Sequence, residues 1–264
     1  MKLLELTNVN KTYHRGGWFV QRDNVEALSD VSLTVEEQCS VGVIGRSGAG
    51  KSTLGRLILG LERPNGGNIR YRDKDMMDFS RSDWRRFRRE VQVVFQNAQG
   101  SVNPRWQVFD IIAEPIRNNQ RLSTGELEKK IDQLLQMVGL DPQDKRKYAH
   151  QFSGGQLQRV CIARALSIEP KLIVLDEAVS SLDMLIQAQI LALLRELQRQ
   201  THVSYLFISH DIRIVAGFCD KVVVLDGGRV SSHLQDISCA EDSENPVVRE
   251  LAHAILPAWP QAAG

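Results

Sequence analysis

The stretch GRSGAGKS, residues 45–52, determines which fold the sequence can adopt. It fits the pattern G-x-x-x-x-G-K-[ST], with the apolar run SVGVI before it and the helical pattern KSTLGRLILG at 51–60. In this context backbone N–H groups wrap a phosphate chain, the lysine reaches the β- and γ-phosphates, and the last hydroxyl serves Mg²⁺. The predicted phosphate-binding residues are Gly45, Arg46, Ser47, Gly48, Ala49, Gly50, Lys51, Ser52 and Thr53.

Short β-branched runs alternate with helical patterns along the rest of the chain. The runs that follow the glycine-rich loop are VQVVFQ (91–96), KLIVLDE (171–177), VSYLFISH (203–210) and KVVVLDGGRV (221–230). This alternation predicts an α/β fold with a largely parallel sheet that is covered by helices.

Three sections depart from this alternation. From about residue 97 to 155 the segments are helical; one of them, at 123–140, opens with a capping box between Ser123 and Glu126. We therefore expect a helical subdomain inserted into the α/β core. DGGR at 226–229 predicts a hairpin, so the sheet should finish in antiparallel strands. Residues from 238 onward mix proline and small side chains and are interpreted as a C-terminal extension.

The composition excludes several functional classes. Lys and Arg number 33 against 32 for Asp and Glu, so the charge of +1 gives no support for nucleic-acid binding. The five arginines of RSDWRRFRRE (81–90) are interpreted as a solvated helix face. No run approaches the roughly 20 apolar residues of a membrane span, and we expect a cytosolic chain. The isolated cysteines indicate neither a zinc site nor a disulfide framework.

Two acidic residues end the apolar run LIVLDE. Asp176 is predicted to hold Mg²⁺, and Glu177, beside it, to orient or deprotonate an attacking water. A GTPase is disfavoured, because NKTY at 10–13 has Tyr13 where the base-recognition pattern N-K-x-D needs aspartate.

The stretch FSGGQLQRV, residues 152–160, places a hydroxyl and two glycines at the start of a helical segment. Free N–H groups and the positive end of the helix dipole suit an anion such as phosphate. Taken alone, such a turn is more often an ordinary helix cap.

The glycine-rich loop, LDE and SGGQ occur in the order seen in the ATP-binding subunits of ABC transporters, and the whole chain resembles that family. The resemblance implies a P-loop NTPase core of the ABC ATPase type over residues 1–237, with a helical subdomain and an antiparallel β subdomain, and an extension over 238–264. It also implies roles for four residues: Gln96 contacts Mg²⁺, Tyr13 stacks on adenine, Asp183 belongs to the D-loop, and His210 lies near the γ-phosphate.

In this family the SGGQ stretch faces the nucleotide of a neighbouring subunit. The resemblance therefore implies that Ser153, Gly154, Gly155 and Gln156 act in trans and that a lone chain hydrolyses ATP poorly. The sequence departs from the family at Phe152, where leucine is common, and at Ala178 and Val179, where proline and threonine are common.

VNPR at 102–105 and the tail NPVVRELAHAILPAWP at 245–260 are similar to the dipeptide, oligopeptide and nickel importer branch. This implies a peripheral subunit on the cytoplasmic face of the bacterial inner membrane. Its partners would be a second, related but different ATPase, two permease subunits seated near Gln96 and residues 97–117, and indirectly an extracytoplasmic substrate-binding protein. Nickel is the favoured cargo, and dipeptides or metal-chelator complexes such as opines are the alternative. No iron–sulfur cluster is expected, because the tail holds only Cys239.

Two other classes of protein fit the sequence less well. A soluble ABC ATPase of DNA repair or translation would carry a long coiled coil or two cassettes in one chain. A subunit that only senses nucleotide would have lost Lys51, Glu177 or His210, all of which are present.

Overall fold

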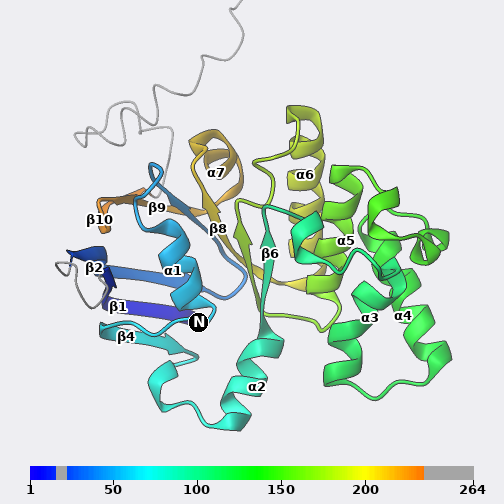
Figure 1. The fold of residues 1–264 in the computed structure, drawn as a ribbon, viewed down its shortest axis with the longest axis horizontal. Coiled ribbons are helices and arrows are strands. Elements are labelled where there is room, and N and C mark those ends of the chain that lie inside the picture. Colours follow the sequence, from blue (N-terminus) through cyan, green and yellow to red (C-terminus); the bar gives the residue numbers. More distant parts are fainter. Residues whose placement is uncertain (16–22, 235–264) are drawn as a thin grey trace, which may run out of the picture.

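The computed structural model describes residues 1–15 and 23–234 (Figure 1). The predicted C-terminal extension, residues 238–264, lies outside the described residues. The described part contains a six-stranded sheet, a four-stranded sheet, and a group of helices beside the larger sheet. No helix of this part is long and apolar enough to cross a membrane.

The larger sheet has the strand order β10-β9-β3-β8-β7-β6. Its strands are β3 (Ser40–Ile44), β6 (Val91–Phe95), β7 (Leu172–Asp176), β8 (Ser204–Ser209), β9 (Lys221–Asp226) and β10 (Arg229–Leu234). All neighbours pair in parallel except β9 and β10. Every residue of β3 is buried, as expected for a central strand that is covered on both faces. The predicted, largely parallel sheet is confirmed.

The smaller sheet has the order β2-β1-β4-β5 and its pairs are antiparallel. It consists of β1 (Lys2–Arg15), β2 (Asp23–Glu36), β4 (Gly66–Tyr71) and β5 (Lys74–Asp75), and it confirms the antiparallel β subdomain. Helix α1 (Lys51–Ile58) packs between the two sheets. Its residues Leu54, Leu57 and Ile58, at helical spacing, share one apolar core with residues of both sheets.

The regular elements between β6 and β7 are helices and 3-10 turns, as predicted (Figure 1). It contains α3 (Val108–Asn119), α4 (Thr124–Met137) and α5 (Gly154–Leu166), with the short 3-10 turns η2 (Gln99–Ser101), η3 (Pro142–Arg146) and η4 (Ala149–Gln151). The predicted capping box of Ser123 and Glu126 starts α4. The division of residues 97–155 from the core as a separate subdomain stays a prediction.

The remaining helices flank the larger sheet or join the two sheets. They are the 3-10 turn η1 (Met76–Asp78), α2 (Arg81–Glu90), α6 (Met184–Thr201) and α7 (Ile212–Phe218). The five arginines of α2 are exposed, whereas Phe87 and Glu90 are buried, which confirms the predicted solvated face.

The predicted hairpin joins β9 to β10 through Gly227 and Gly228, whose φ angles are 51° and 79°. Two consecutive positive φ angles are what a two-residue turn of matching twist requires. The Gly228 N–H donates to the Ala49 carbonyl over 3.2 Å, and the Gly228 carbonyl accepts from the Ser29 N–H over 2.8 Å. The turn therefore connects the glycine-rich loop to strand β2.

The two glycines of this turn should differ in their tolerance of a methyl group. Left-handed φ costs alanine about 1–2 kcal/mol at either position. An added Cβ meets nothing within 4 Å at Gly227, but it would lie 2.8 Å from the Ala27 carbonyl oxygen at Gly228. We expect Gly228→Ala to lower the free energy of unfolding by about 2–4 kcal/mol and Gly227→Ala by about 1–2 kcal/mol. Urea denaturation of the nucleotide-free protein measures both values, and equal losses would contradict the contact with Ala27.

Candidate functional site

A pocket of about 540 Å³ opens where the chain leaves the carboxyl ends of β3, β7 and β8. Its walls come from the glycine-rich loop, from β2 and from the residues just after β7 and β8. They comprise Val25, Glu26, Ala27, Ser47, Gly48, Gly50, Lys51, Ser52, Thr53, Glu177 and His210. Parallel strands bring their following loops to one edge of the sheet, which is why residues so far apart in sequence meet here.

The glycine-rich loop turns directly into helix α1. Gly50 is the residue before the helix; its φ is 101°, and a Cβ there would lie 2.6 Å from the Ala27 carbonyl oxygen. Only glycine fits this position without strain. The first N–H groups of α1 therefore face the loop, which places the positive end of the helix dipole at the pocket and favours an anion there.

The Lys51 side chain is buried and lies back over its own loop. Its Nζ donates to the Gly45 carbonyl over 2.7 Å and to the Arg46 carbonyl over 2.9 Å. Burial lowers the pKa of Lys51, and the charges of Glu177 and Asp176 partly oppose that shift. The ammonium group thus forms part of the pocket wall.

Asp176 ends β7 as a half-buried carboxylate. Burial raises its pKa and the charge of Glu177 adds to this, whereas Arg56 and Lys51 act in the opposite direction. No donor within the described residues is hydrogen-bonded to this carboxylate. Its lone pairs and the exposed hydroxyl of Ser52 in the pocket wall are oxygen donors of the kind that Mg²⁺ prefers, so these residues fit a cation.

Glu177 adopts a left-handed backbone conformation with a φ of 49°. For a residue other than glycine this conformation is uncommon and strained, and it persists only where surrounding contacts impose it. Its N–H donates to the Ile208 carbonyl over 2.9 Å, and its carbonyl accepts from the N–H and the hydroxyl of Ser180. The carboxylate lies 3.3 Å from Nδ1 of His210. The structure therefore brings Glu177 and His210 together, and their roles stay predictions.

The SGGQ residues lie at the start of α5. Ser153 is the N-cap: the Gln156 N–H donates to the Ser153 hydroxyl over 3.3 Å, and the Ser153 N–H donates to Oε1 of Gln156 over 3.0 Å. Ser153, Gly154 and Gln156 are exposed, Gly155 is buried, and none of the four lines the pocket. Their contact with a second chain stays a prediction, and this exposure leaves the helix start accessible to one.

The predicted residues Gly45, Arg46, Ala49 and Asp176 lie close to lining residues in the chain but are not part of the pocket wall, and three further predicted residues also lie outside it. Gln96 is exposed beyond the end of β6, and Asp183 caps α6 by accepting from the Ile186 N–H over 3.0 Å. The Tyr13 hydroxyl donates to Glu62 over 2.7 Å and accepts from Arg56 over 3.1 Å. The structure thus places Tyr13 among charged side chains near the carboxyl end of α1. Its contact with adenine stays a prediction.

The sequence did not reveal several residues that shape this site. Ser180 holds the Glu177 backbone, Gly228 contacts the glycine-rich loop, and the pocket wall at residues 25–27 comes from β2. Gly228 and residues 25–27 come from segments distant in sequence from the glycine-rich loop, so no local pattern could have revealed their contacts, whereas Ser180 lies only three residues after Glu177. The DGGR hairpin signal located Gly228 but not its neighbour Ala49.

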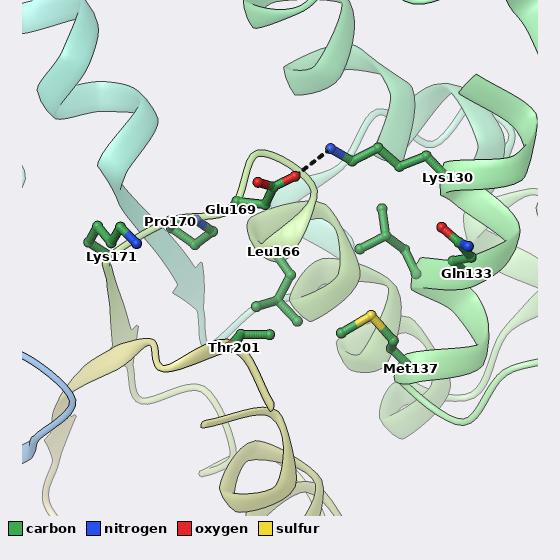
Figure 2. A pocket seen from close by; sticks show the side chains of 9 residues that line it. Lys130, Gln133, Met137, Leu166, Glu169, Pro170, Lys171 and Thr201 are labelled. Atoms are coloured by element: carbon green, nitrogen blue, oxygen red, sulfur yellow. Dashed lines mark hydrogen bonds and ion pairs between the residues drawn. The ribbon is translucent and has the colours of Figure 1, made fainter. Parts of the chain in front are cut away.

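A second pocket lies near the opposite edge of the sheet (Figure 2). Lys171 and Thr201 in its wall lie close before β7 and β8, and Lys130 bonds to Glu169 over 2.9 Å across it. It contains none of the predicted site residues, so the nucleotide site is assigned to the first pocket.

Residues 28–180 match the family model described as ABC transporter. The chain belongs to the ABC transporter family. It is 47% identical to the nickel import ATP-binding protein NikE of Rhodospirillum rubrum over 99% of this chain and 94% of that protein. It is 42% identical to the proteins of the same name from Escherichia coli O157:H7 and Brucella suis, over 98% of this chain and 97% of each.

Solved structures of ABC cassettes share the fold. A dimeric post-hydrolysis state of the ATP-binding cassette MJ0796, bound to ADP and Pi, matches with a TM-score of 0.76 and 28% identity over 88% of this chain and 98% of that one. The cbiO1 subunit of the cbiONQ transporter complex from Clostridium perfringens matches with a TM-score of 0.77 and 27% identity over 96% and 99%. The chain is therefore an ATP-binding subunit with the P-loop ATPase fold of ABC transporters.

The raised pKa of Asp176 has a measurable effect on stability. The folded state holds the Asp176 proton more tightly than the unfolded chain does, so stability from this group is present at low pH and is lost as pH rises through the folded pKa. At pH 7 we expect Asp176→Asn to raise the urea midpoint of the nucleotide-free and metal-free protein, and the gain should shrink as the pH is lowered.

The exposed Asp78 provides the control, since Asp78→Asn should change stability by less than about 0.5 kcal/mol. If Asp176→Asn is no more stable than the wild-type protein at pH 7, the raised pKa is contradicted.

Proposed function

We propose that this chain is the ATP-hydrolysing subunit of an ABC importer and that the cargo of the importer is nickel. The observation that carries the ATPase assignment is the meeting of Lys51, Glu177 and His210 around one pocket, with Asp176 beside them. The cargo assignment is supported by the names of full-length relatives, which are nickel import ATP-binding proteins. Import of dipeptides, oligopeptides or metal-chelator complexes is the alternative.

ATP would be held by the glycine-rich loop and the start of α1. Residues 45–53 present backbone N–H groups to the phosphates, and Lys51, already positioned over the loop, would contact the β- and γ-phosphates. Ser52, Gln96 and Asp176 would hold Mg²⁺, which when bound neutralises charge on the phosphate oxygens. Tyr13 would stack on the adenine.

Hydrolysis would depend on Glu177. Its carboxylate would orient the attacking water or accept a proton from it, and its fixed backbone restricts where that water lies. His210, within 3.3 Å of the same carboxylate, would contact the γ-phosphate. The strained conformation of Glu177 favours this role, because such strain clusters at functional sites.

A second ATPase subunit would complete the site. Its residues equivalent to Ser153–Gln156 would face the γ-phosphate, where the start of a helix offers roughly half a positive charge. The similarity to a dimeric cassette bound to ADP and Pi supports this arrangement. We expect a related but different chain as the partner and slow hydrolysis by the lone chain. Asp183 would lie at the same junction.

The ATPase pair would work on two permease subunits, with an extracytoplasmic substrate-binding protein acting indirectly. The permease would seat near Gln96 and residues 97–117, so that closing of the pair around ATP moves it and hydrolysis reopens the pair. The chain would thus lie peripherally on the cytoplasmic face of the bacterial inner membrane. We divide it into an ATP-binding domain at 1–237, with the helical subdomain at 97–155, and an extension at 238–264.

Glu177→Gln should stop hydrolysis without preventing ATP binding. In the transporter purified with its membrane subunits, we expect turnover to fall by roughly 100-fold or more, because the variant cannot act on the attacking water. Release of phosphate and retention of ATP measure the two effects. Glu169→Gln, at an exposed glutamate of the second pocket, should hydrolyse ATP normally.

The contact in trans is tested by adding Ser153→Arg to the Glu177→Gln chain. The exposed arginine should prevent the closed pair from accumulating, while ATP still binds to each subunit. A closed pair that accumulates as well as in Glu177→Gln alone would remove Ser153 from the shared site.

The cargo is tested in cells that lack this chain. They should lose uptake of radioactive nickel and keep uptake of dipeptides, and the wild-type chain should restore nickel uptake whereas the Lys51→Ala chain should not. Loss of dipeptide uptake with normal nickel uptake would replace nickel by peptide as the cargo. If both are unaffected, uptake of a metal-chelator complex is measured in the same cells, and normal uptake of that complex too would overturn the importer assignment.

A further inference from the structure

Gln96 and Glu177, which we assign to the metal and the attacking water, directly follow the ends of two neighbouring strands. We call the point where these two segments separate the fork, and the two segments its branches. Strands β6 and β7 pair in parallel, and the last pair of their ladder is Phe95 with Asp176. The next residues, Gln96 and Glu177, follow separate paths. At this fork lies the side chain of Gln158 from α5, of which 1% is exposed.

One amide group spans the two branches. Nε2 of Gln158 donates to the Ala178 carbonyl over 2.6 Å and to the Phe95 carbonyl over a longer 3.4 Å. A primary amide carries two N–H groups on one nitrogen, so it can serve both carbonyls at once. One carbonyl belongs to the peptide unit that leads into Gln96, and the other belongs to the residue directly after Glu177. Gln158 thus links the two branches where the ladder of backbone bonds has ended.

Further contacts hold the same region. The Ser181 hydroxyl donates to the Gln96 carbonyl over 3.4 Å, which joins the segment after Glu177 to the other branch. Arg164, also on α5, donates from Nη1 to the Ser101 carbonyl over 2.6 Å. The backbone from Phe95 to Ser101 is therefore held near both its ends by side chains of α5.

An apolar side chain could fill the volume of Gln158 but could not satisfy these carbonyls. The buried Ala178 carbonyl would be left without this donor, which lowers stability, so some loss of stability is expected from any substitution here. A functional role for Gln158 requires, in addition, that its two hydrogen bonds fix the relative positions of Gln96 and Glu177. Errors of about 1 Å in such positions can reduce a reaction rate by roughly 100-fold.

We propose that Gln158 is a positioning residue for ATP hydrolysis, which fixes the backbones of Gln96 and Glu177 relative to each other and connects both to α5. The inference rests on the proposed ATPase function. Because Ser153 caps the start of α5, the helix that would present the SGGQ residues to a second subunit also holds the hydrolysis residues of its own site. Gln158 does not line the pocket, so ATP binding should not depend on it.

The test is the kinetics of the purified transporter with Gln158→Met, which keeps an unbranched side chain of similar length without a donor. We expect kcat to fall by roughly 10- to 100-fold, with KM for ATP within about twofold of the wild-type value. Gln158→Asn keeps the amide but withdraws it by one methylene. It should retain at most one of the two bonds and lie between the wild type and Gln158→Met in kcat.

A matched control separates positioning from stability. Gln198 donates from Nε2 to the Ser40 hydroxyl over 2.9 Å at the amino end of β3, away from the pocket. Gln198→Met should lower the melting temperature while leaving kcat unchanged. The inference is overturned if the Gln158 variants lose no more kcat than Gln198→Met, or if their loss appears in KM. Should Gln158→Met not fold, the kcat of Gln158→Asn decides in the same way.

The wild-type transporter tells the two failures apart. If it hydrolyses ATP while Gln158→Met and Gln158→Asn keep full kcat, only the positioning role is lost. If the wild-type transporter does not hydrolyse ATP, the proposed function itself fails.

Discussion

Parallel pairing of β3, β8 and β7 is the constraint on which the rest of the structure depends. Because these neighbours run in one direction, the segments that follow them emerge at a single edge, and Lys51, Glu177 and His210 meet although they are far apart in sequence. The buried apolar strands supply the rigidity, and the loops supply the polar groups. The positions of the polar groups in the loops are therefore set by where the strands end.

Several residues at the same edge of the sheet have charges or backbone conformations that are unfavourable for folding. Lys51 is buried as a cation among carbonyl oxygens, Asp176 is a carboxylate whose ionisation burial opposes, and Glu177 has a left-handed backbone. None of these features favours folding of the free protein, and the core beneath them has to offset the cost. In the proposed function these residues hold a phosphate chain and a cation, so the fold would give up stability in exchange for binding and hydrolysis.

Local patterns predicted the glycine-rich loop, the parallel strands, the capping box at Ser123 and the DGGR hairpin, because each depends on a few neighbouring residues. The resemblance of ordered motifs predicted the antiparallel sheet, which composition and periodicity did not. Contacts between segments distant in sequence could not be predicted: the backbone contact of Gly228 with Ala49 and the side-chain contact of Gln158 with the Ala178 carbonyl leave no mark on their own segments. The ionic partners of Tyr13 were missed for the same reason.

The position of β3 also affects how the protein is made. Its two neighbours in the sheet, β8 and β9, begin at Ser204 and Lys221, more than 150 residues after β3 itself at Ser40–Ile44. On the ribosome, this buried strand has no partner until most of the chain has been synthesised. Such late, long-range pairing slows folding, and meanwhile apolar side chains and an unpaired strand edge are open to aggregation. Nascent chains of this protein should therefore depend on chaperones until the last strands emerge.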